Sequence, residues 1–315
     1  MSKFAPNPER CFQKIDNLQA LLQNGIHSLK DCVFQGLDFG AFPMNWEILE
    51  VENATFLGCA LSPKEETYLR ERGAYIYPRP ENLPYHPFRS KLYTWQELME
   101  TEHSSSTSID WTIYHHFYQQ RFNPPINEAL WQRVHDHAID DALRSLLQFD
   151  AVGMTKKKCV GFMGGHSTKR TDKYYEKTAF TAKLLAEAGY FIVSGGGPGI
   201  MEATNLGAYL AGRPVSDLED ALKILQVAPH YTHPDFNAKA IEVIEQYPNG
   251  TASLAIPTWF YGHEPSNLFS THIAKYFSNS IREDTLLAIC LYGVVYAPGS
   301  AGTTQEIFMD ATQNH

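Results

Sequence analysis

The chain has 315 residues, of which 43% are hydrophobic and 19% are charged. This composition suits a globular protein of one large or two ordinary domains, and it excludes a disulfide miniprotein and a wholly disordered chain. The formal net charge of -9 has the wrong sign for a protein that coats phosphate backbones, so we expect no nucleic-acid partner. A small anionic ligand remains compatible with this charge, because backbone dipoles bind anions locally.

The cysteine pattern and the lack of long apolar runs indicate where the protein resides. The five cysteines are scattered and form no C-x-x-C pair, which favours neither a disulfide framework nor a zinc knuckle. The N-terminus lacks the apolar stretch of a signal peptide. The longest apolar run, Leu286 to Ala297, is far shorter than the roughly 20 residues of a membrane-spanning helix. We therefore expect a soluble, cytoplasmic protein with no membrane partner.

Residues 1–150 read as a smaller α+β region of unknown role. Composition changes near residue 150, where a lysine triplet at 156–158 precedes a β-like run, and we place a domain boundary there. Within this region the segments 32–39 and 54–61 share a Phe-x-Gly core. They are either two stacked strand rungs or two unrelated strands, since two copies are too few to establish a repeat.

An amphipathic helix is predicted over 127–148, where apolar residues recur at helical spacing. Its His135 and His137 resemble a metal-ligand pair at first sight. They lie two positions apart on different helix faces, whereas ligands on one helix are three or four apart, so we expect a structural or solvated role.

From Lys158 onward strands and helices alternate. This alternation predicts an α/β fold over 151–315, a doubly wound, Rossmann-like parallel sheet with helices on both faces. Such a domain normally adds a further strand and helix, so a chain ending at His315 is either a fragment or has a sheet that is short at one edge. The predicted strands are 159–163, 191–194, 253–257 and 294–297, and the predicted helical stretches are 174–188, 200–210, a polar insertion over 213–250, 266–291, and 303 onward.

Three of these strand ends carry small, flexible residues: MGGHS at 163–167, SGGGPG at 194–199 and PGSAGT at 298–303. In an open parallel sheet the carboxyl ends of the strands face the crevice where ligands bind. Glycine lets the backbone approach an anion closely, and the helix that follows supplies a partial positive charge. We expect a phosphate group there. The second loop fits neither G-x-G-x-x-G nor G-x-x-x-x-G-K-[ST], which disfavours ordinary NAD binding and P-loop NTPase chemistry.

Two of these motifs resemble those of a known family. SGGGPGIMEA at 194–203 and PGSAGTTQE at 298–306 are similar to the GGGxxGxM and PGGxGTxxE motifs of the LONELY GUY (LOG) phosphoribohydrolases. Within that superfamily, GGHS at 164–167 together with GPGIMEA at 197–203 is more similar to the bacterial nucleotide 5'-monophosphate nucleosidases. The resemblance covers roughly residues 158–315 and leaves residues 1–150 without an assigned role.

The resemblance implies hydrolysis of the N-glycosidic bond of a nucleoside monophosphate, giving free base and ribose 5-phosphate without a cofactor or a metal. Such a bond breaks through an oxocarbenium-like sugar, so the site needs a phosphate anchor, a carboxylate near the anomeric carbon and a placed water. Glu306 is the expected catalytic carboxylate, orienting ribose hydroxyls or water. The alternative is a glutamate that merely complements the dipole of its helix.

The remaining site residues follow from the same motifs. The family uses an arginine on the preceding helix. Arg282 is the nearest candidate, although it lies one residue from the usual spacing, and a surface salt bridge is its alternative role. Ser300 replaces the second glycine of PGG and would suffer if that backbone needed a positive φ. The predicted phosphate-binding residues are Gly195, Gly196, Gly197, Gly199, Gly299, Ser300, Gly302 and Thr303. The predicted ribose or base pocket residues are Gly165, His166, Ser167, Met201 and Glu202.

Two other clusters are open to interpretation. His230, His233 and Asp235 could suggest a metal site, but they lie in a loop-like insertion and this chemistry needs no metal, so we expect none. The aromatic residues at 259–261 follow a strand end and are equally compatible with stacking on a base and with packing in the core.

Three functions are compatible with the pattern. A nucleoside monophosphate hydrolase is the leading interpretation. We expect it to be a homodimer, built through a helix within 269–291, or a higher homo-oligomer. A non-catalytic carrier of a phosphorylated nucleotide or cofactor is the second, and Glu306 discriminates, because a carrier has no need for it. A dehydrogenase of the ordinary dinucleotide type is the third and would bind NADH. The preferred base is not determined by the sequence.

Overall fold

The computed structural model describes residues 11–99, 108–150, 153–262 and 266–313. The chain divides into two compact units, one up to Ser90 and one from Lys91, and each is described by itself. Residues 91–150 thus share contacts with the second unit, whereas composition predicted a boundary near residue 150.

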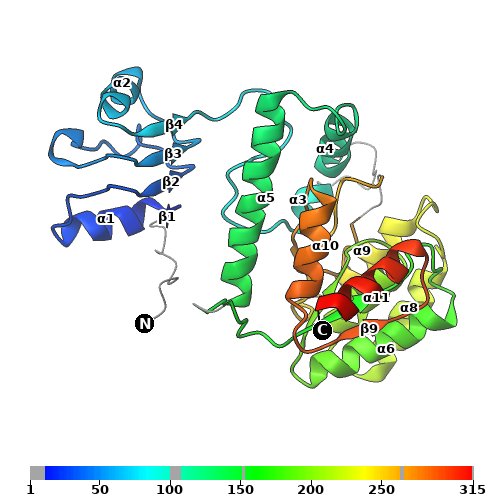
Figure 1. The fold of residues 1–315 in the computed structure, drawn as a ribbon. Helices are drawn as coiled ribbons and strands as arrows, with labels where there is room; N and C mark the ends of the chain where they lie inside the picture. The colour runs from blue at the N-terminus through cyan, green and yellow to red at the C-terminus, as the bar shows by residue number, and fades with distance from the viewer. Residues whose placement is uncertain (1–10, 100–107, 151–152, 263–265, 314–315) are drawn as a thin grey trace. The chain divides into compact units, whose positions relative to one another are not determined.

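The first unit is a parallel sheet of four short strands in the order β1-β2-β3-β4 (Figure 1). The strands pair in sequence order, so each one adds to the edge left by the strand before it. The elements are β1 (Cys11–Phe12), α1 (Ile15–Gln23), β2 (Val33–Gln35), the 3-10 helix η1 (Trp46–Ile48), β3 (Thr55–Leu57), α2 (Pro63–Glu71) and β4 (Tyr75–Tyr77).

The two Phe-x-Gly segments are stacked rungs of this sheet. Phe34 of β2 pairs with Phe56 of β3, and their rings stack with centroids 4.7 Å apart. The glycines that follow, Gly36 and Gly58, both adopt a positive φ. A Cβ on Gly58 would also overlap the ring of Phe88. Glycine is therefore required where each rung turns away from the sheet.

The second unit is built on a five-stranded parallel sheet, which confirms the predicted α/β fold. Its order is β8-β7-β6-β5-β9. The chain moves outward from β5 to β8 and then returns to place β9 on the other side of β5. The order therefore reverses at β5, where open α/β sheets bind their ligands. The strands are β5 (Cys159–Met163), β6 (Phe191–Ser194), β7 (Leu254–Ala255), β8 (His272–Ile273) and β9 (Val294–Tyr296).

Helices flank this sheet, and most follow the expected positions (Figure 1). They are α3 (Trp95–Met99), α4 (Ile109–Tyr118), α5 (Ile126–Leu147), α6 (Lys173–Glu187), α7 (Ile200–Tyr209), α8 (Val215–Gln226), α9 (Phe236–Gln246), α10 (Asn279–Ala288) and α11 (Ala301–Gln313). The long helix predicted over 266–291 forms only in its second half, as α10. Its first half, 266–278, is not helical and contains the two-residue strand β8, because pairing of Leu254 with His272 across the sheet outweighs the local helical pattern.

Helix α5 is joined to the rest of the second unit by buried polar contacts. The Asp136 carboxylate accepts hydrogen bonds from the backbone N–H groups of Phe277 and Ser278, both at 2.9 Å, just before α10 begins. His135 is buried and its Nε2 lies 2.8 Å from the hydroxyl of Tyr93. His135 therefore has a structural role, whereas His137 is exposed beside Asp141.

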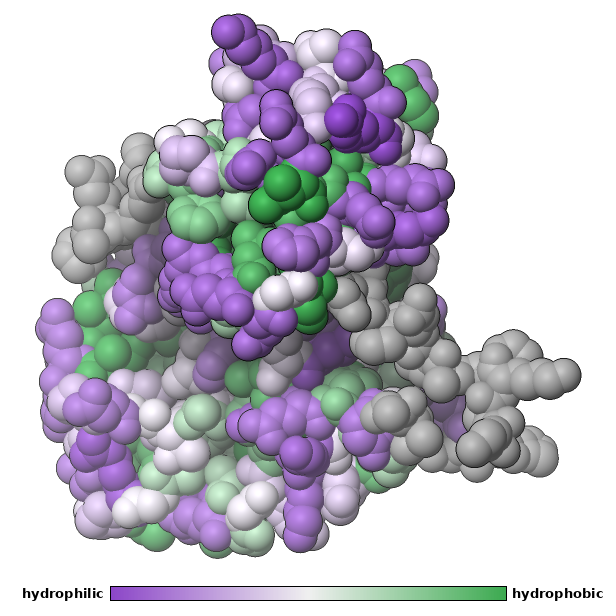
Figure 2. Space-filling model, turned by 90° about the vertical axis from the view of Figure 1, so that its left-hand side faces the viewer, coloured by the Kyte–Doolittle hydropathy of each residue, from purple (hydrophilic) through white to green (hydrophobic). Residues whose placement is uncertain are grey.

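Within the described ranges, none of the helices is both long enough and apolar enough to cross a lipid bilayer. On the face drawn in Figure 2, hydrophilic residues cover much of the surface, with small hydrophobic groups between them.

Candidate active site

Three glycine-containing loops meet at the carboxyl edge of the second sheet. They follow β5, β6 and β9, which are neighbours around the point where the strand order reverses. Gly165 links all three, because its N–H donates to the carbonyl of Pro298 at 3.0 Å and its own carbonyl accepts from the N–H of Ile200 at 3.1 Å. The sheet thus brings together the loops that the sequence placed at separate strand ends.

Gly199 is the residue that makes this contact sterically possible. Its φ is +69°, and a Cβ there would overlap the carbonyl oxygen of Gly165 and lie 2.7 Å from that of His166. Only glycine combines that backbone conformation with so close an approach. Helix α7 begins immediately afterwards, so Gly199 also fixes where its N-terminus points.

A buried polar network holds the loop after β6 from beneath. The hydroxyl of Ser194 donates to Oδ1 of Asn205 at 2.6 Å and accepts from the N–H of Gly196 at 3.0 Å. Asn267 donates its side-chain amide to the same Oδ1, and its backbone N–H donates to the carbonyl of Gly196. Residues 195–199 are buried. The loop is therefore a fixed part of the sheet edge.

The backbone donors of that loop are only partly available to a ligand. The Gly196 N–H is engaged by Ser194, whereas the Gly197 N–H contacts the sulfur of Met201 at 3.4 Å. Thioether sulfur is a weak acceptor, so an anion could replace it at Gly197. Met201 therefore lies against the loop.

The loop after β9 is more open. Gly299, Ser300 and Gly302 are exposed, and α11 starts here, so the N–H groups of its first turn have no acceptor within the helix. Thr303 is buried, and a Cβ on Gly299 would overlap its hydroxyl. Ser300 does not adopt a positive φ. Serine in place of the glycine of the PGG motif therefore puts no strain on this backbone.

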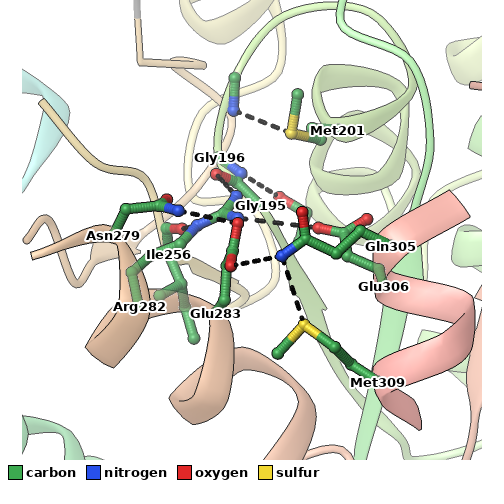
Figure 3. A network of polar contacts seen from close by, with 12 residues as sticks. Gly195, Gly196, Met201, Ile256, Asn279, Arg282, Glu283, Gln305, Glu306 and Met309 are labelled. Atoms are coloured by element: carbon green, nitrogen blue, oxygen red, sulfur yellow. Dashed lines mark hydrogen bonds and ion pairs between the residues drawn. The ribbon is translucent and has the colours of Figure 1, made fainter. Parts of the chain in front are cut away.

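Arg282 is fixed by the ends of two strands (Figure 3). Its Nε donates to the carbonyl of Ile256 at 2.8 Å, and its Nη2 donates to the carbonyl of Gly195 at 3.3 Å. These bonds orient the buried guanidinium from behind and leave Nη1 directed at Glu306, whose Oε1 lies 3.6 Å away. The predicted arginine and carboxylate are therefore neighbours at the sheet edge.

Glu306 lies on the second turn of α11 and is largely buried, with 15% of its side chain exposed. Burial raises the pKa of its carboxyl; the Arg282 guanidinium counteracts this, and the negative charge of Glu283 adds to it. The hydroxyl of Tyr296 donates to the backbone carbonyl of Glu306 at 3.2 Å. A carboxylate of raised pKa beside a fixed guanidinium is the pattern expected of a functional acid or base.

Glu202 is placed differently from the prediction. Its carboxylate is buried and accepts from Nε of Arg170 at 2.9 Å and from the hydroxyl of Tyr175 at 2.8 Å. Arg170 also donates to the backbone carbonyls of Ala228 and Phe236. These contacts assign Glu202 to a structural ion pair beneath α7, and they do not support its predicted place in a ribose or base pocket.

The rim of the site is less closely held. Ser167 is exposed, and His166 is half-buried with its ring centroid 6.3 Å from that of Tyr231. Of the aromatic residues at 259–261, Trp259 belongs to the core and donates its Nε1–H to Asp110, whereas Tyr261 is 63% exposed.

No group of three or more His, Cys, Asp or Glu residues in the described part of the chain is arranged to hold a metal ion. His230 pairs instead with the hydroxyl of Thr232, its Nδ1 lying 2.9 Å from that oxygen.

A set of polar residues that the sequence did not single out borders Arg282 and Glu306. Glu283, Asn279 and Gln305 form a hydrogen-bonded group on α10 and α11 (Figure 3). Their only sequence signal was adjacency, because Glu283 follows Arg282 and Gln305 precedes Glu306.

A separate cavity of about 310 Å³ lies between α4, α5 and the start of α10, and the predicted site residues are not part of its wall.

Comparisons with known proteins match only part of the chain. Residues 157–214 match the SLOG cluster4 family. This match associates β5, β6 and their two glycine loops with nucleotide-related binding or catalysis, and it ends before Arg282 and Glu306. No curated protein matches. Among solved structures, a molybdenum cofactor binding protein from the phototrophic bacterium Rippkaea orientalis is similar at 14% identity, with a TM-score of 0.32 over 50% of this chain and 73% of that one.

Proposed function

We propose that the second unit hydrolyses the N-glycosidic bond of nucleoside 5'-monophosphates, giving free base and ribose 5-phosphate, as in the LOG-type phosphoribohydrolases that the motifs resemble. The observation that carries this proposal is the position of Glu306. Its carboxylate lies against Arg282, and its helix begins at the loop joined to Gly165. A phosphate at that helix start would place the sugar of one nucleotide within reach of this carboxylate.

In this proposal the loops bind the 5'-phosphate. The first-turn N–H groups of α11 and the Thr303 hydroxyl would donate to it, and the Gly197 N–H would exchange the Met201 sulfur for a phosphate oxygen. The exposure of Ser300 and Gly302 supports entry of the anion from this side. Because the phosphate is bound by backbone dipoles, the negative net charge of the protein is no obstacle.

Glu306 and Arg282 have different roles in the proposed chemical step. Water adds to the anomeric carbon as the bond to the base nitrogen breaks, and the base leaves with a proton. Ionised Glu306 would orient the ribose hydroxyls or the attacking water and would stabilise the positive charge that develops on the sugar. Arg282, held by two carbonyl oxygens, would keep the carboxylate ionised and in place.

Incubation of the protein with a panel of purine and pyrimidine nucleoside monophosphates, followed by chromatography for free base, tests the proposal. Glu306→Gln keeps the size of the side chain and should abolish release of ribose 5-phosphate. A carrier protein would bind nucleotide equally well with either residue and would release no base. Full activity of Glu306→Gln would contradict the assignment.

We also propose that the protein forms a homodimer, as the resemblance implies. Light scattering coupled to size-exclusion chromatography tests this directly, and a mass of one chain at working concentrations would contradict it.

A further inference from the structure

Glu283 connects three segments around the candidate site. Its Oε1 accepts from the hydroxyl of Tyr261 at 3.2 Å and from the side-chain amide of Asn279 at 2.8 Å. Its Oε2 accepts from the side-chain amide of Gln305 at 3.0 Å. The carboxylate therefore joins α10, α11 and the segment after β7 through three neutral donors. Figure 3 shows two of these donors, Asn279 and Gln305.

The bond between Glu283 and Gln305 matters because each of these residues is adjacent in sequence to a predicted catalytic residue. Glu283 directly follows Arg282, and Gln305 directly precedes Glu306. The contact between Arg282 and Glu306 is a single one at 3.6 Å, longer than an ordinary charge-assisted hydrogen bond. The bond from Gln305 to Glu283 is shorter and holds the two helices at this level. It is therefore this neighbouring bond that sets the register between α10 and the second turn of α11.

We propose that Glu283 is a positioning residue of the reaction, which holds the Glu306 carboxylate in register with Arg282 by binding Gln305 on α11. This inference rests on the proposed hydrolase function. Tyr261 and Asn279 fix the orientation of Glu283, since Asn279 also donates to the Tyr261 hydroxyl at 2.8 Å. The residue acts on the substrate only through Glu306.

The charge of Glu283 supplies a readout that a purely structural role would lack. The charged and titratable groups that face Glu306 are Arg282 and Glu283 from α10, Tyr296 from β9, and Asp310 from its own helix, which acts through Tyr296. Glu283 raises the pKa of the Glu306 carboxyl. Removing that charge should lower this pKa, so the acidic limb of the activity profile should move to lower pH.

Four single variants, together with the double variant that combines Glu283→Ala and Gln305→Ala, test the inference. Glu283→Gln removes the charge and keeps the shape, Glu283→Ala removes the acceptor, and Gln305→Ala removes the donor from the other side. Asp284→Asn is the matched control, because it removes the same charge from the next, exposed residue of α10. Thermal unfolding of each variant, and its affinity for ribose 5-phosphate by calorimetry, separate loss of positioning from loss of fold.

We expect Glu283→Ala and Gln305→Ala each to lower kcat by about 100-fold, as a displacement of roughly 1 Å does in other sites, while KM changes little. The double variant should be no worse than either single one, because both remove the same bond. Glu283→Gln should shift the acidic limb to lower pH, and Asp284→Asn should match the wild type.

The two proposals fail in different ways. If the wild type releases base but Glu283→Gln and Gln305→Ala behave like Asp284→Asn, the role of Glu283 is overturned and the hydrolase function stands. If the wild type releases no base from any nucleotide of the panel, the hydrolase function itself is overturned. If Glu283→Ala is unfolded, the pH profile of Glu283→Gln decides, and an unshifted acidic limb overturns the inference.

Discussion

Nη1 of Arg282 lies 3.6 Å from Oε1 of Glu306, and the guanidinium that makes this contact is bound from behind by the carbonyl oxygens of Ile256 and Gly195. Those two residues directly follow the carboxyl ends of β7 and β6. The sheet edge therefore fixes the arginine first, and the arginine then fixes the electrostatic environment of the acid. A side chain of equal charge but different shape could not do both.

Arg282→Lys tests this dependence on shape. A lysine can donate to one of the two carbonyls, but it cannot also present a second nitrogen to Glu306. Nucleotide hydrolysis should fall by about 100-fold in kcat/KM, comparable to the loss of one fixed donor in other active sites. The unpaired carbonyl should cost about 1–3 kcal/mol of unfolding free energy.

The control for this substitution is Arg144→Lys. Arg144 lies on the surface of α5, with 56% of its side chain exposed, and it pairs with Asp141. Kinetics and urea unfolding of both variants make the comparison, and Arg144→Lys should match the wild type. Wild-type rates in Arg282→Lys would show that charge alone is sufficient.

Gly199→Ala should disrupt the junction of the loops. The new Cβ would meet the carbonyl oxygens of Gly165 and His166 at a backbone conformation that alanine rarely adopts. We expect a loss of about 3 kcal/mol or more in unfolding free energy. Gly262→Ala is the control, because nothing lies within 4 Å of its Cβ position. Equal urea midpoints for the two variants would mean that the junction tolerates displacement.

Glu202→Gln tests whether Glu202 is structural. The substitution leaves the buried guanidinium of Arg170 without its counter-charge, and breaking a buried pair in this way typically costs about 3–5 kcal/mol. Differential scanning calorimetry should show a marked fall in Tm. The same change at exposed Glu219 should leave Tm unaltered. If Glu202→Gln instead kept its Tm and lost only nucleotide affinity, the pocket role would be restored.

Most strands of the second unit could be predicted from the sequence, because local apolar runs indicate them. Strands β5 and β6 match the predicted ranges to the residue, since short apolar runs bounded by Lys and Gly are typical of buried parallel strands. Strand β8 was missed because it consists of His272 and Ile273 and is defined by its partner β7. A two-residue strand has no periodicity of its own.

In the candidate site, too, features set by local sequence were predictable, whereas contacts between distant residues were not. The meeting of the glycine loops was predictable, because the carboxyl ends of parallel strands share one edge. The partner of Glu202 was not predictable, because Arg170 reaches it from a loop 32 residues earlier in the chain. The link from Glu283 to Gln305 is likewise a contact between two helices that local spacing does not encode.

Glu306→Gln should change how stability depends on pH. Burial raises the pKa of Glu306 in the folded protein, whereas an unfolded glutamate titrates near about 4.3. Between these two values the folded state binds more protons than the unfolded chain, so the contribution of Glu306 to stability falls as pH rises through the folded pKa. The glutamine variant lacks this loss.

The difference in unfolding free energy between Glu306→Gln and the wild type should therefore shift in favour of the variant as the pH is raised from about 4 to 8. Urea unfolding at a series of pH values measures this difference directly. A rising advantage of the variant would mean that the ionised Glu306 carboxylate lowers the stability of the fold, as residues kept for function often do. A difference that shifts in favour of the wild type would mean that Arg282 outweighs burial, and that the Glu306 carboxylate stabilises the sheet edge.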